Sequence, residues 1–298
     1  MSPLKNNYMV STLRSLRLRQ WIKNLLIFSP LFFSGQVANS DLLIKAIQGF
    51  IAFSLIASST YLINDLVDRK ADVNHPRKKN RPIARGELSS AQVITVAALL
   101  STAGFTWAFF LNIPFFLVLL SYFFITLTYH LWLKHIALLD VLTVTIGYLL
   151  RIGAGSVLVK VEPSPWLLLV TFSLAMFLVV SKRKGELKQV KEEFRRSSLK
   201  VYSEKVLSSM LYTSATLAIT SYALYAFTST TNPVTNRFIL WISALPVIFG
   251  AFRYLYIVEQ ENKGEEPEEE LLRDVPLLIS VLVWGIIMYL AFYLPPLV

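Results

Sequence analysis

Long blocks of apolar residues alternate with short polar stretches along this chain, and the apolar blocks are similar in length. A transmembrane helix needs about 20 mostly apolar residues in a row. Nine blocks are candidates, at residues 22–38, 42–63, 91–111, 114–133, 136–158, 165–181, 206–228, 237–258 and 274–295. The first block is the weakest, because Lys23, Asn24 and Pro30 interrupt it. Strand-like alternation does not compete with this pattern. The sequence therefore predicts an all-α membrane protein with nine transmembrane helices.

Composition and charge support this class and add an orientation. The 298 residues are 54% hydrophobic and 16% charged, whereas about a quarter of the residues in soluble domains are charged. Most of the 29 Lys and Arg residues lie in the N-terminal arm and in the stretches 64–90 and 182–205. This bias predicts a cytoplasmic N-terminus and an external C-terminus in the cell (inner) membrane. The net charge of +10 is thus concentrated on one membrane face, which indicates contact with the lipid bilayer rather than with nucleic acid.

The two long polar stretches, 64–90 and 182–205, are the candidate sites for chemistry. They stand four predicted helices apart, which suits two four-helix units around a central cavity open to the cytoplasmic face. No linker indicates a second domain, so we expect residues 1–298 to form one integral-membrane domain. The acidic stretch 259–271 is interpreted as a solvated connector. The absence of cysteine excludes disulfides, thiolate metal sites and a cysteine nucleophile.

Three aspartates follow the second apolar block directly. If the helix of that block continues, Asp65, Asp68 and Asp72 fall on one of its faces. Stacked carboxylates repel one another unless a cation neutralises them, and Mg²⁺ prefers a few carboxylates together with phosphate oxygens of a ligand. The alternative is a solvated loop whose acids pair with nearby cations such as Arg69 and Arg77. We favour metal and phosphate binding, because ionisable groups at membrane depth are costly.

Other polar residues lie at the ends of apolar blocks. Lys23 and Asn24 are just inside the first block, where polar groups need partners, and we assign them to phosphate binding. Tyr129 and Lys134 end the fourth block on the cytoplasmic side. They are either an interface tyrosine and a snorkelling lysine or part of a polar cavity.

Two charges lie within the fifth block. Asp140 and Arg151 are about three helical turns apart and could share a face of that helix. A structural role with neighbouring helices and a substrate contact both remain open for them.

The stretch 17–24 fits an amphipathic helix on the membrane surface, with Arg17 and Arg19 near the lipid headgroups.

The pattern Asn64-Asp65-x-x-Asp68-x-x-x-Asp72, between the second and third of nine predicted helices, resembles the first aspartate-rich motif of the UbiA superfamily of intramembrane prenyltransferases. Further stretches resemble one branch, the decaprenyl-phosphate phosphoribosyltransferases. These stretches are Arg17-Leu18-Arg19-Gln20-Trp21-Ile22-Lys23-Asn24, His75-Pro76 with Arg81-Pro82-Ile83-Ala84, and Ser181-Lys182-Arg183-Lys184-Gly185-Glu186-Leu187. The resemblance implies 5-phosphoribosyl-1-diphosphate and a polyprenyl phosphate as substrates.

One departure from the wider superfamily supports this branch. Typical aromatic prenyltransferases carry a second aspartate motif between helices six and seven, whereas the equivalent stretch here contains no aspartate. It carries Lys182, Arg183 and Glu186 nearest the helix end. A carboxylate cluster plus a cationic cluster suits a donor with a diphosphate at one end and a phosphate at the other. The orientation bias alone accounts for about half of these cations.

The resulting hypothesis is Mg²⁺-dependent transfer of 5-phosphoribosyl to a decaprenyl-like polyprenyl phosphate, releasing pyrophosphate, for cell-envelope glycolipid synthesis. Asp65, Asp68 and Asp72 would hold Mg²⁺, and Asn64 would orient a carboxylate or a phosphate oxygen. The cations and polar groups assigned to the substrates are Lys23, Asn24, Arg77, Lys78, Arg81, Tyr129, Lys134, Arg151, Lys182, Arg183 and Glu186.

Two rival functions differ in chemistry or class. One is transfer of a prenyl group from a polyprenyl diphosphate to an aromatic acceptor, as in quinone biosynthesis. The other is transport, against which stands the lack of evident inverted repeats with broken helices. Polyprenyl length and oligomeric state are open at this point.

Overall fold

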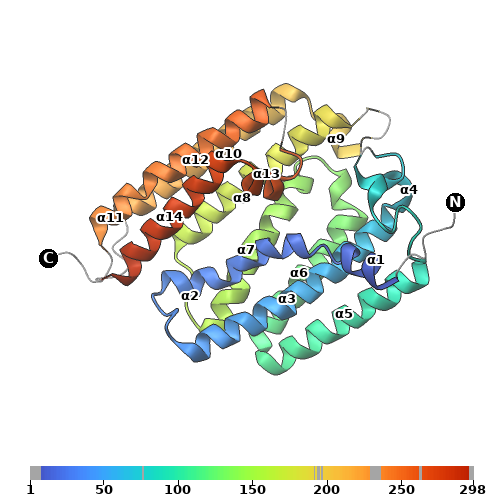
Figure 1. The fold of residues 1–298 in the computed structure, drawn as a ribbon, viewed down its shortest axis with the longest axis horizontal. Helices are drawn as coiled ribbons and strands as arrows, with labels where there is room; N and C mark the ends of the chain where they lie inside the picture. The colour runs from blue at the N-terminus through green and yellow to red at the C-terminus, as the bar shows by residue number, and fades with distance from the viewer. Residues whose placement is uncertain are drawn as a thin grey trace. The chain divides into compact units, whose positions relative to one another are not determined.

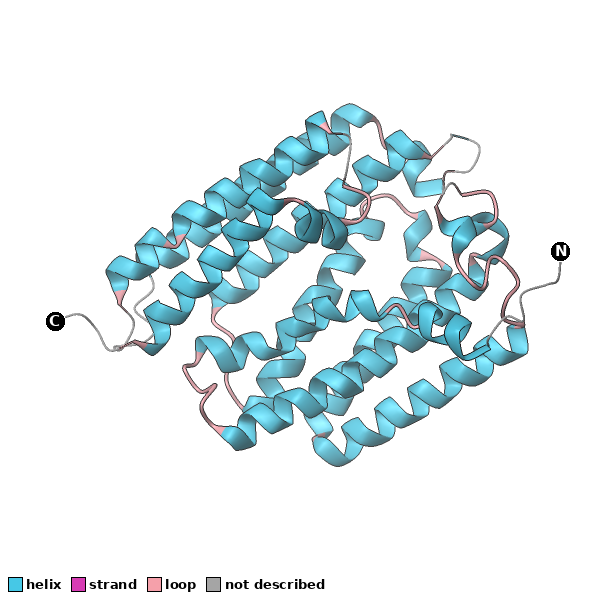
Figure 2. Cartoon of the chain, in the orientation of Figure 1, coloured by secondary structure: helices cyan, strands magenta, loops and turns pink. Residues whose placement is uncertain are grey.

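The computed structural model describes residues 8–75, 77–190, 192, 195, 197–228, 236–261 and 264–294. In this described part every regular element is a helix (Figure 2). Contacts divide the chain into two compact units. Unit 1 comprises Met1–Glu162 and Val190–Ser198, and unit 2 comprises Pro163–Gln189 and Leu199–Val298. A single domain over 1–298 stays a prediction.

Unit 1 begins with short helices and continues with four long ones (Figure 1). Its elements are α1 (Tyr8–Ser15), the 3₁₀ helix η1 (Leu18–Phe28), α2 (Ser29–Phe33), α3 (Ser40–Val67), α4 (Arg69–Asp72), η2 (Lys78–Asn80), α5 (Ser90–Leu111), α6 (Ile113–Leu131), η3 (Leu133–His135) and α7 (Leu139–Val159). The start of α5 carries a capping box, in which Ser89 and Gln92 satisfy each other's backbone N–H groups.

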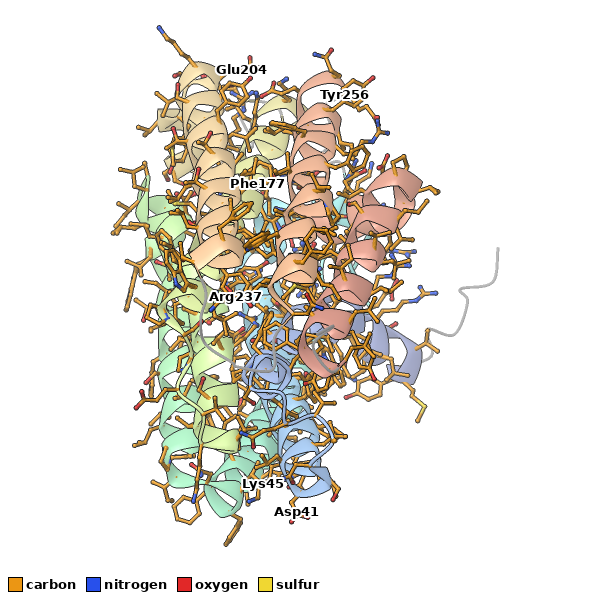
Figure 3. All side chains as sticks on the ribbon, turned by 90° about the vertical axis from the view of Figure 1, so that its left-hand side faces the viewer. Asp41, Lys45, Phe177, Glu204, Arg237 and Tyr256 are labelled. Atoms are coloured by element: carbon orange, nitrogen blue, oxygen red, sulfur yellow. The ribbon has the colours of Figure 1, made fainter. Side chains whose placement is uncertain are left out.

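Unit 2 combines the long helices α8, α10, α12 and α14 with shorter ones. Its elements are α8 (Pro165–Gln189), α10 (Glu204–Thr228), α11 (Arg237–Ile242), α12 (Ala244–Gln260), α13 (Pro267–Arg273) and α14 (Val275–Tyr293), while α9 (Ser197–Val201) crosses the boundary between the units. Glu204 at the start of α10 and Tyr256 near the end of α12 lie at one end of this set, and Arg237 lies at the other (Figure 3). The ring of Phe177 on α8 packs edge-on against Tyr254, with the ring centroids 5.3 Å apart.

Seven helices of the described part are long and apolar enough to span a membrane. They are α3, α5, α6, α7, α8, α14 and the continuous stretch Arg237–Gln260 that α11 and α12 form together. Each coincides with a predicted block. The count of nine stays a prediction, because α10 has the length of a span but carries many Ser, Thr and Tyr residues.

The first predicted span, 22–38, departs from a single helix. It divides into the 3₁₀ helix η1 and the short helix α2. Pro30 lies in the first turn of α2, where its missing N–H costs nothing. Asn24 is 1% exposed within η1 and needs buried hydrogen-bond partners. The interruptions in the sequence thus mark a real break.

The acidic stretch 259–271 is also less solvated than predicted. Part of it forms α13, and Glu265 and Glu270 are buried. Gly185 of α8 explains why this segment approaches so closely, since a Cβ atom there would lie 2.7 Å from the backbone N of Glu265. Glu265 therefore packs closely against α8 and is not solvated.

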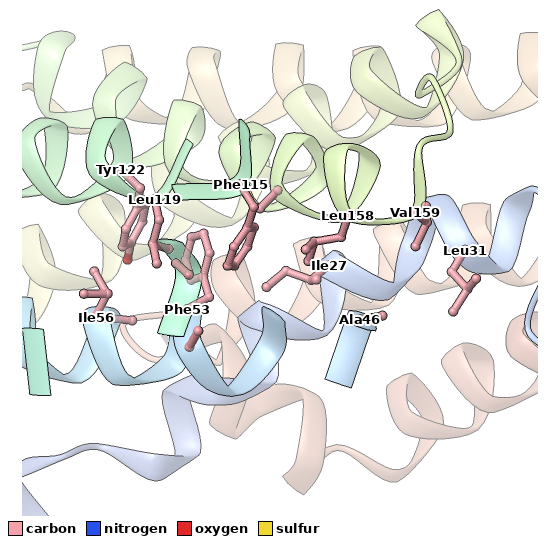
Figure 4. Packing of buried hydrophobic residues seen from close by; sticks show 14 residues of the cluster. Ile27, Leu31, Ala46, Phe53, Ile56, Phe115, Leu119, Tyr122, Leu158 and Val159 are labelled. Atoms are coloured by element: carbon pink, nitrogen blue, oxygen red, sulfur yellow. The ribbon is translucent and has the colours of Figure 1, made fainter. Parts of the chain in front are cut away.

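The core of unit 1 forms where η1 crosses α3, α6 and α7. Ile27, Phe53, Phe115 and Leu119 are fully buried in one cluster (Figure 4). Gly155 of α7 allows η1 to come this close, because a Cβ atom there would lie 2.0 Å from the carbonyl oxygen of Ile27. The close crossing of η1 and α7 thus requires glycine at position 155, because any larger residue would carry a Cβ atom there.

We expect Gly155→Ala to destabilise the protein by about 3 kcal/mol, because the new methyl group meets backbone that cannot move aside independently. Gly153→Ala is the matched control, since a Cβ atom there meets nothing within 4 Å and alanine favours the helix. Thermal unfolding of both variants in detergent measures the difference. Equal midpoints would contradict the close crossing of η1 and α7.

Candidate active site

The end of α3 carries the aspartates, but the helix does not continue through them as predicted. It ends at Val67, Asp68 is its C-cap residue with φ −85° and ψ 0°, and α4 then begins at Arg69. Asp65 and Asp72 are 3% and 4% exposed. Asp65 therefore lies on α3 and Asp72 on α4, and Asp68 lies at the break between the two helices.

Arg81 joins the two buried aspartates. Its Nη1 atom donates to Asp65 Oδ1 at 3.1 Å and to Asp72 Oδ2 at 2.6 Å. One guanidinium nitrogen thus lies between two carboxylates from α3 and α4. Burial raises the pKa of the Asp72 carboxyl, and the positive charges of Arg81 and Lys78 oppose that rise. This arrangement favours a cation between the two side chains.

The third aspartate has a different partner. Asp68 Oδ1 accepts a hydrogen bond from Lys134 Nζ at 2.5 Å. Lys134 has a side chain only 6% exposed, and its carbonyl oxygen accepts from Ser198 Oγ at 2.7 Å. Lys134 therefore belongs to the polar cluster and does not snorkel to the membrane surface. Tyr129, one turn earlier, packs edge-on against His130.

Sequence reasoning missed Arg17 as a site residue and placed it near the headgroups. In the structure its Nη2 atom donates to Asp65 Oδ1, and its guanidinium lies over the Tyr61 ring, 5.3 Å from the centroid. Arg17 has φ 53° and ψ 50°, a left-handed conformation that turns the chain between α1 and η1. The stretch 17–24 had marked the segment, but this turn, which directs the arginine to α3, has no sequence signal.

The aspartates partly fit a shared metal ion. Within the described residues no three Asp, Glu or His side chains converge closely enough to hold one ion, and Asp68 is paired with Lys134. Asp65 and Asp72 do fit, since Arg81 already lies between their oxygens as a cation would. Metal ligation by Asp65, Asp68 and Asp72 stays a prediction.

The remaining predicted residues around the aspartates occupy less central places. Asn64 is near Asp65, with Nδ2 and Oδ1 3.5 Å apart. The backbone N–H groups of Arg77 and Lys78 both donate to His75 Nδ1 at 3.3 Å. Lys78 is half-buried and Arg77 is exposed. Pro76, part of the resemblance, lies outside the described residues.

Arg151 and Asn24 meet inside unit 1. Arg151 Nε donates to Asn24 Oδ1 at 2.8 Å, its Nη1 to the carbonyl of Gly147 at 2.6 Å, and its Nη2 to Tyr122 Oη at 3.1 Å. Asn24 Nδ2 in turn donates to Ser54 Oγ at 2.9 Å. Hydrogen bonds thus join η1, α3, α6 and α7.

Aromatic rings also surround the Arg151 guanidinium. It lies 5.3, 5.0 and 5.4 Å from the ring centroids of Phe53, Tyr122 and Tyr148, which stabilise a buried cation. Asp140 shares the helix but hydrogen-bonds to Ser198, with the oxygens 3.4 Å apart. These contacts support the structural alternative for both residues, and a substrate contact by Arg151 stays a prediction. Lys23 is half-buried on η1, one residue before Asn24.

In unit 2 the predicted basic loop is helical at its start. α8 continues to Gln189, so Lys182, Arg183 and Glu186 lie on its last turns. Arg183 Nη1 and Glu186 Oε2 are 3.0 Å apart, and both residues are buried. Lys191 and Glu193, from the same predicted loop, lie outside the described residues.

The neighbouring Lys184 connects three helices. It is 1% exposed, and its Nζ atom contacts Glu259 of α12 and Ser208 Oγ of α10 at 2.7 Å. Its charge therefore stabilises unit 2, and it is a poorer candidate for ligand binding than its neighbours.

We expect Lys184→Met to lower the free energy of unfolding by roughly 1–3 kcal/mol, because it leaves the Glu259 carboxylate without its buried partner. The double variant Lys184→Met with Glu259→Gln should recover much of that loss, since no uncompensated charge remains. Denaturation of the single and double variants forms the test. Additive losses would show that the two side chains do not interact.

Comparisons with known proteins agree with this fold. The sequence model of the UbiA prenyltransferase family matches residues 26–269. The decaprenyl-phosphate phosphoribosyltransferase of Mycobacterium tuberculosis is 34% identical over 284 residues, covering 93% of each chain. That of Corynebacterium glutamicum is 31% identical over 290 residues, covering 95% of this chain and 87% of the relative.

A solved structure shares the architecture. The UbiA homolog from Archaeoglobus fulgidus, solved with GPP and Mg²⁺, matches with a TM-score of 0.71 at 21% identity, covering 95% of this chain and 96% of that one. Its likeness shows the fold. Together with the family match over most of the chain and seven apolar helices, it leads to one conclusion: the chain belongs to the UbiA prenyltransferase family and is an integral, multi-pass membrane protein.

Proposed function

We propose that this protein is a polyprenyl-phosphate phosphoribosyltransferase, which moves 5-phosphoribosyl from 5-phosphoribosyl-1-diphosphate to a decaprenyl-like polyprenyl phosphate and releases pyrophosphate. The observation that carries this is the extent of the match to relatives of that name, at 34% identity over 93% of the chain. The Asp65–Arg81–Asp72 cluster supports the proposal, because its carboxylates and its guanidinium would together hold a metal ion and a diphosphate. Envelope glycolipid synthesis is the proposed purpose.

Asp65 and Asp72 would hold Mg²⁺ with the donor diphosphate, with Asp68 and Asn64 as the remaining predicted contributors. When bound, the ion would neutralise negative charge on the departing pyrophosphate. Binding there would draw Arg81 from between the carboxylates onto phosphate oxygens, because its planar guanidinium suits phosphate as well as carboxylate. Mg²⁺ is named in the description of the Archaeoglobus fulgidus homolog, and for this chain it is part of the proposal.

In the reaction, an oxygen of the polyprenyl phosphate attacks the anomeric carbon of the ribosyl group. The bond from that carbon to the diphosphate oxygen breaks, and pyrophosphate departs with the electron pair. The acceptor phosphate is already ionised near neutrality, so no side chain has to remove a proton. Attack from the side opposite to the leaving group gives a β linkage.

Cationic side chains would offset the negative charge that the three phosphates of the donor and the one phosphate of the acceptor bring together. In unit 1 these are Lys23, Lys78 and Arg81. Arg77 directly precedes Lys78 in the chain, and Lys134 pairs with Asp68. In unit 2 Lys182 and Arg183 are proposed to contact a phosphate, with Glu186 orienting Arg183 through their ion pair. Asn24, Tyr129 and Arg151 complete the predicted set.

The charge distribution supports the proposed location. A cytoplasmic N-terminus would put the aspartates and the basic end of α8 on the cytoplasmic side of the cell membrane. The nine-span arrangement around a cavity open to that side is proposed with it, as is a single domain over the whole chain.

The aromatic prenyltransferase is the main rival, and the residues of 182–205 argue against it. This stretch contains no aspartate, and the acid nearest the membrane, Glu186, is already paired with Arg183. The described residues of this stretch therefore do not form a second buried carboxylate cluster that could hold a prenyl diphosphate.

Release of pyrophosphate tests the proposal in the purified protein. We expect release with Mg²⁺ only when both phosphoribosyl diphosphate and polyprenyl phosphate are supplied. Release with a prenyl diphosphate and an aromatic acid would support the rival enzyme instead. No release with either pair, together with uptake of a phosphorylated solute into vesicles, would support transport.

A further inference from the structure

Helix α1 buries polar side chains and exposes apolar ones, which is the reverse of a helix on a water-soluble protein. Its serines Ser11 and Ser15 are buried, at 4% and 2% exposure, whereas Met9, Val10 and Leu13 are 68%, 43% and 49% exposed. A helix on a water-soluble protein buries its apolar stripe and exposes its polar face. The outer face of α1 therefore requires an apolar surrounding.

Polar contacts fix the inner face of α1 next to the aspartates. Ser11 Oγ donates to Glu87 Oε2 at 2.7 Å, and Glu87 lies shortly before the start of α5. Two residues after α1 ends at Ser15, Arg17 contacts Asp65. In Figure 1 α1 lies beside the end of α3 that leads into α4. Since α3 is a candidate membrane span, we expect hydrocarbon to give way to headgroups near this end of it, at the level of α1.

A bilayer supplies both the apolar medium and a complementary charge at that level. The exposed apolar side chains continue from α1 into η1, with Leu18 and Leu25 49% and 52% exposed. Arg14 is exposed on α1 between these apolar positions. A cation at the headgroup level is attracted to anionic lipid, by about 1 kcal/mol for each Lys or Arg near the surface.

We propose that α1 is a membrane-surface anchor, with Met9, Val10 and Leu13 in the headgroup–acyl boundary of an anionic bilayer and Arg14 against lipid phosphates. The left-handed turn at Arg17 then couples this anchor to Asp65. The anchor thereby holds the aspartates at headgroup depth, where the phosphate of a lipid acceptor would lie. The placement of the acceptor phosphate rests on the proposed function, whereas the binding of α1 to the membrane surface does not.

The absence of cysteine makes α1 accessible to a site-specific probe. Met9→Cys in the full-length protein carries an environment-sensitive fluorophore, and Arg14→Cys carries the same label as a matched control. Both are placed in nanodiscs with and without anionic phosphatidylglycerol. We expect the Met9 label to be quenched by lipids spin-labelled near the top of the acyl chain and protected from aqueous iodide. The Arg14 label should show the opposite pattern.

Three results would overturn the anchor. Equal quenching of both labels by iodide would place the outer face in water. Protection of the Met9 label from both quenchers would indicate protein contact, such as a second copy of the chain. Adding Arg14→Glu to the Met9→Cys protein should abolish any deepening that anionic lipid produces, and an unchanged response would refute the role of Arg14. None of these readouts requires enzymatic activity, so they stand apart from the proposed function.

Discussion

Replacing Asp65 with Asn should lower phosphoribosyl transfer by about 100-fold or more, because the protein loses a carboxylate that would hold Mg²⁺ against the negatively charged leaving group. Asp65 is the carboxylate on which two guanidinium groups, those of Arg17 and Arg81, converge. The variant keeps the shape of the side chain but removes its negative charge. The measurement is the rate of pyrophosphate release at saturating donor and acceptor, with a matched thermal midpoint to show that the protein is folded.

Asp41→Asn is the control for this variant. Asp41 lies at the opposite end of α3, in its first turn and exposed, so its substitution should leave the rate unchanged. Because Asp65 is buried, Asp65→Glu serves as a second variant that keeps the charge and should retain part of the activity. A folded Asp65→Asn protein with the wild-type rate would refute the role of this carboxylate in donor binding.

Replacing Arg81 with Met should raise the KM for the donor by about 10-fold or more, since a bidentate contact to phosphate is among the stronger hydrogen-bonding arrangements. It would also leave two buried carboxylates without the cation between them. Arg81→Lys keeps the charge but loses the planar fork, so an intermediate KM is expected. Initial rates over a range of donor concentrations give these values.

Arg85 supplies the comparison for Arg81. It lies four residues later, its side chain is 57% exposed, and its partner is Glu87 at 3.2 Å. Arg85→Met removes the same charge from the same loop without touching the aspartates, so the donor KM should stay close to wild type. Equal effects of the two substitutions would mean that general loop charge, and not the Arg81 bridge, governs donor binding.

The fold was largely predictable because the bilayer imposes a simple rule. Backbone groups in lipid must be satisfied within a helix, so apolar blocks of the right length become helices. The rule lost precision where polar residues entered a block. Pro30 lies in the first turn of α2, where the first block divides after η1. On α8, which continues beyond its predicted end, Lys184 has buried partners on α10 and α12.

The site was predictable in its acids and less so in their partners. Asp65 and Asp72 stood out because they follow an apolar block, and Arg81 is close in sequence. Arg17 and Lys134, in contrast, contact Asp65 and Asp68 across 48 and 66 residues. Such pairings depend on how the tertiary structure places Arg17 and Lys134 beside the end of α3, and a single sequence carries no direct signal of that placement.

The product lipid itself tests the central claim most directly. The purified full-length protein is incubated with Mg²⁺, decaprenyl phosphate and phosphoribosyl diphosphate labelled in the ribosyl group, and the lipids are extracted. We predict label in the lipid fraction and a mass increase equal to one phosphoribosyl group, with both absent for the Asp65→Asn variant. An unlabelled lipid fraction, together with prenylation of an aromatic acid when prenyl diphosphate is supplied, would contradict the account.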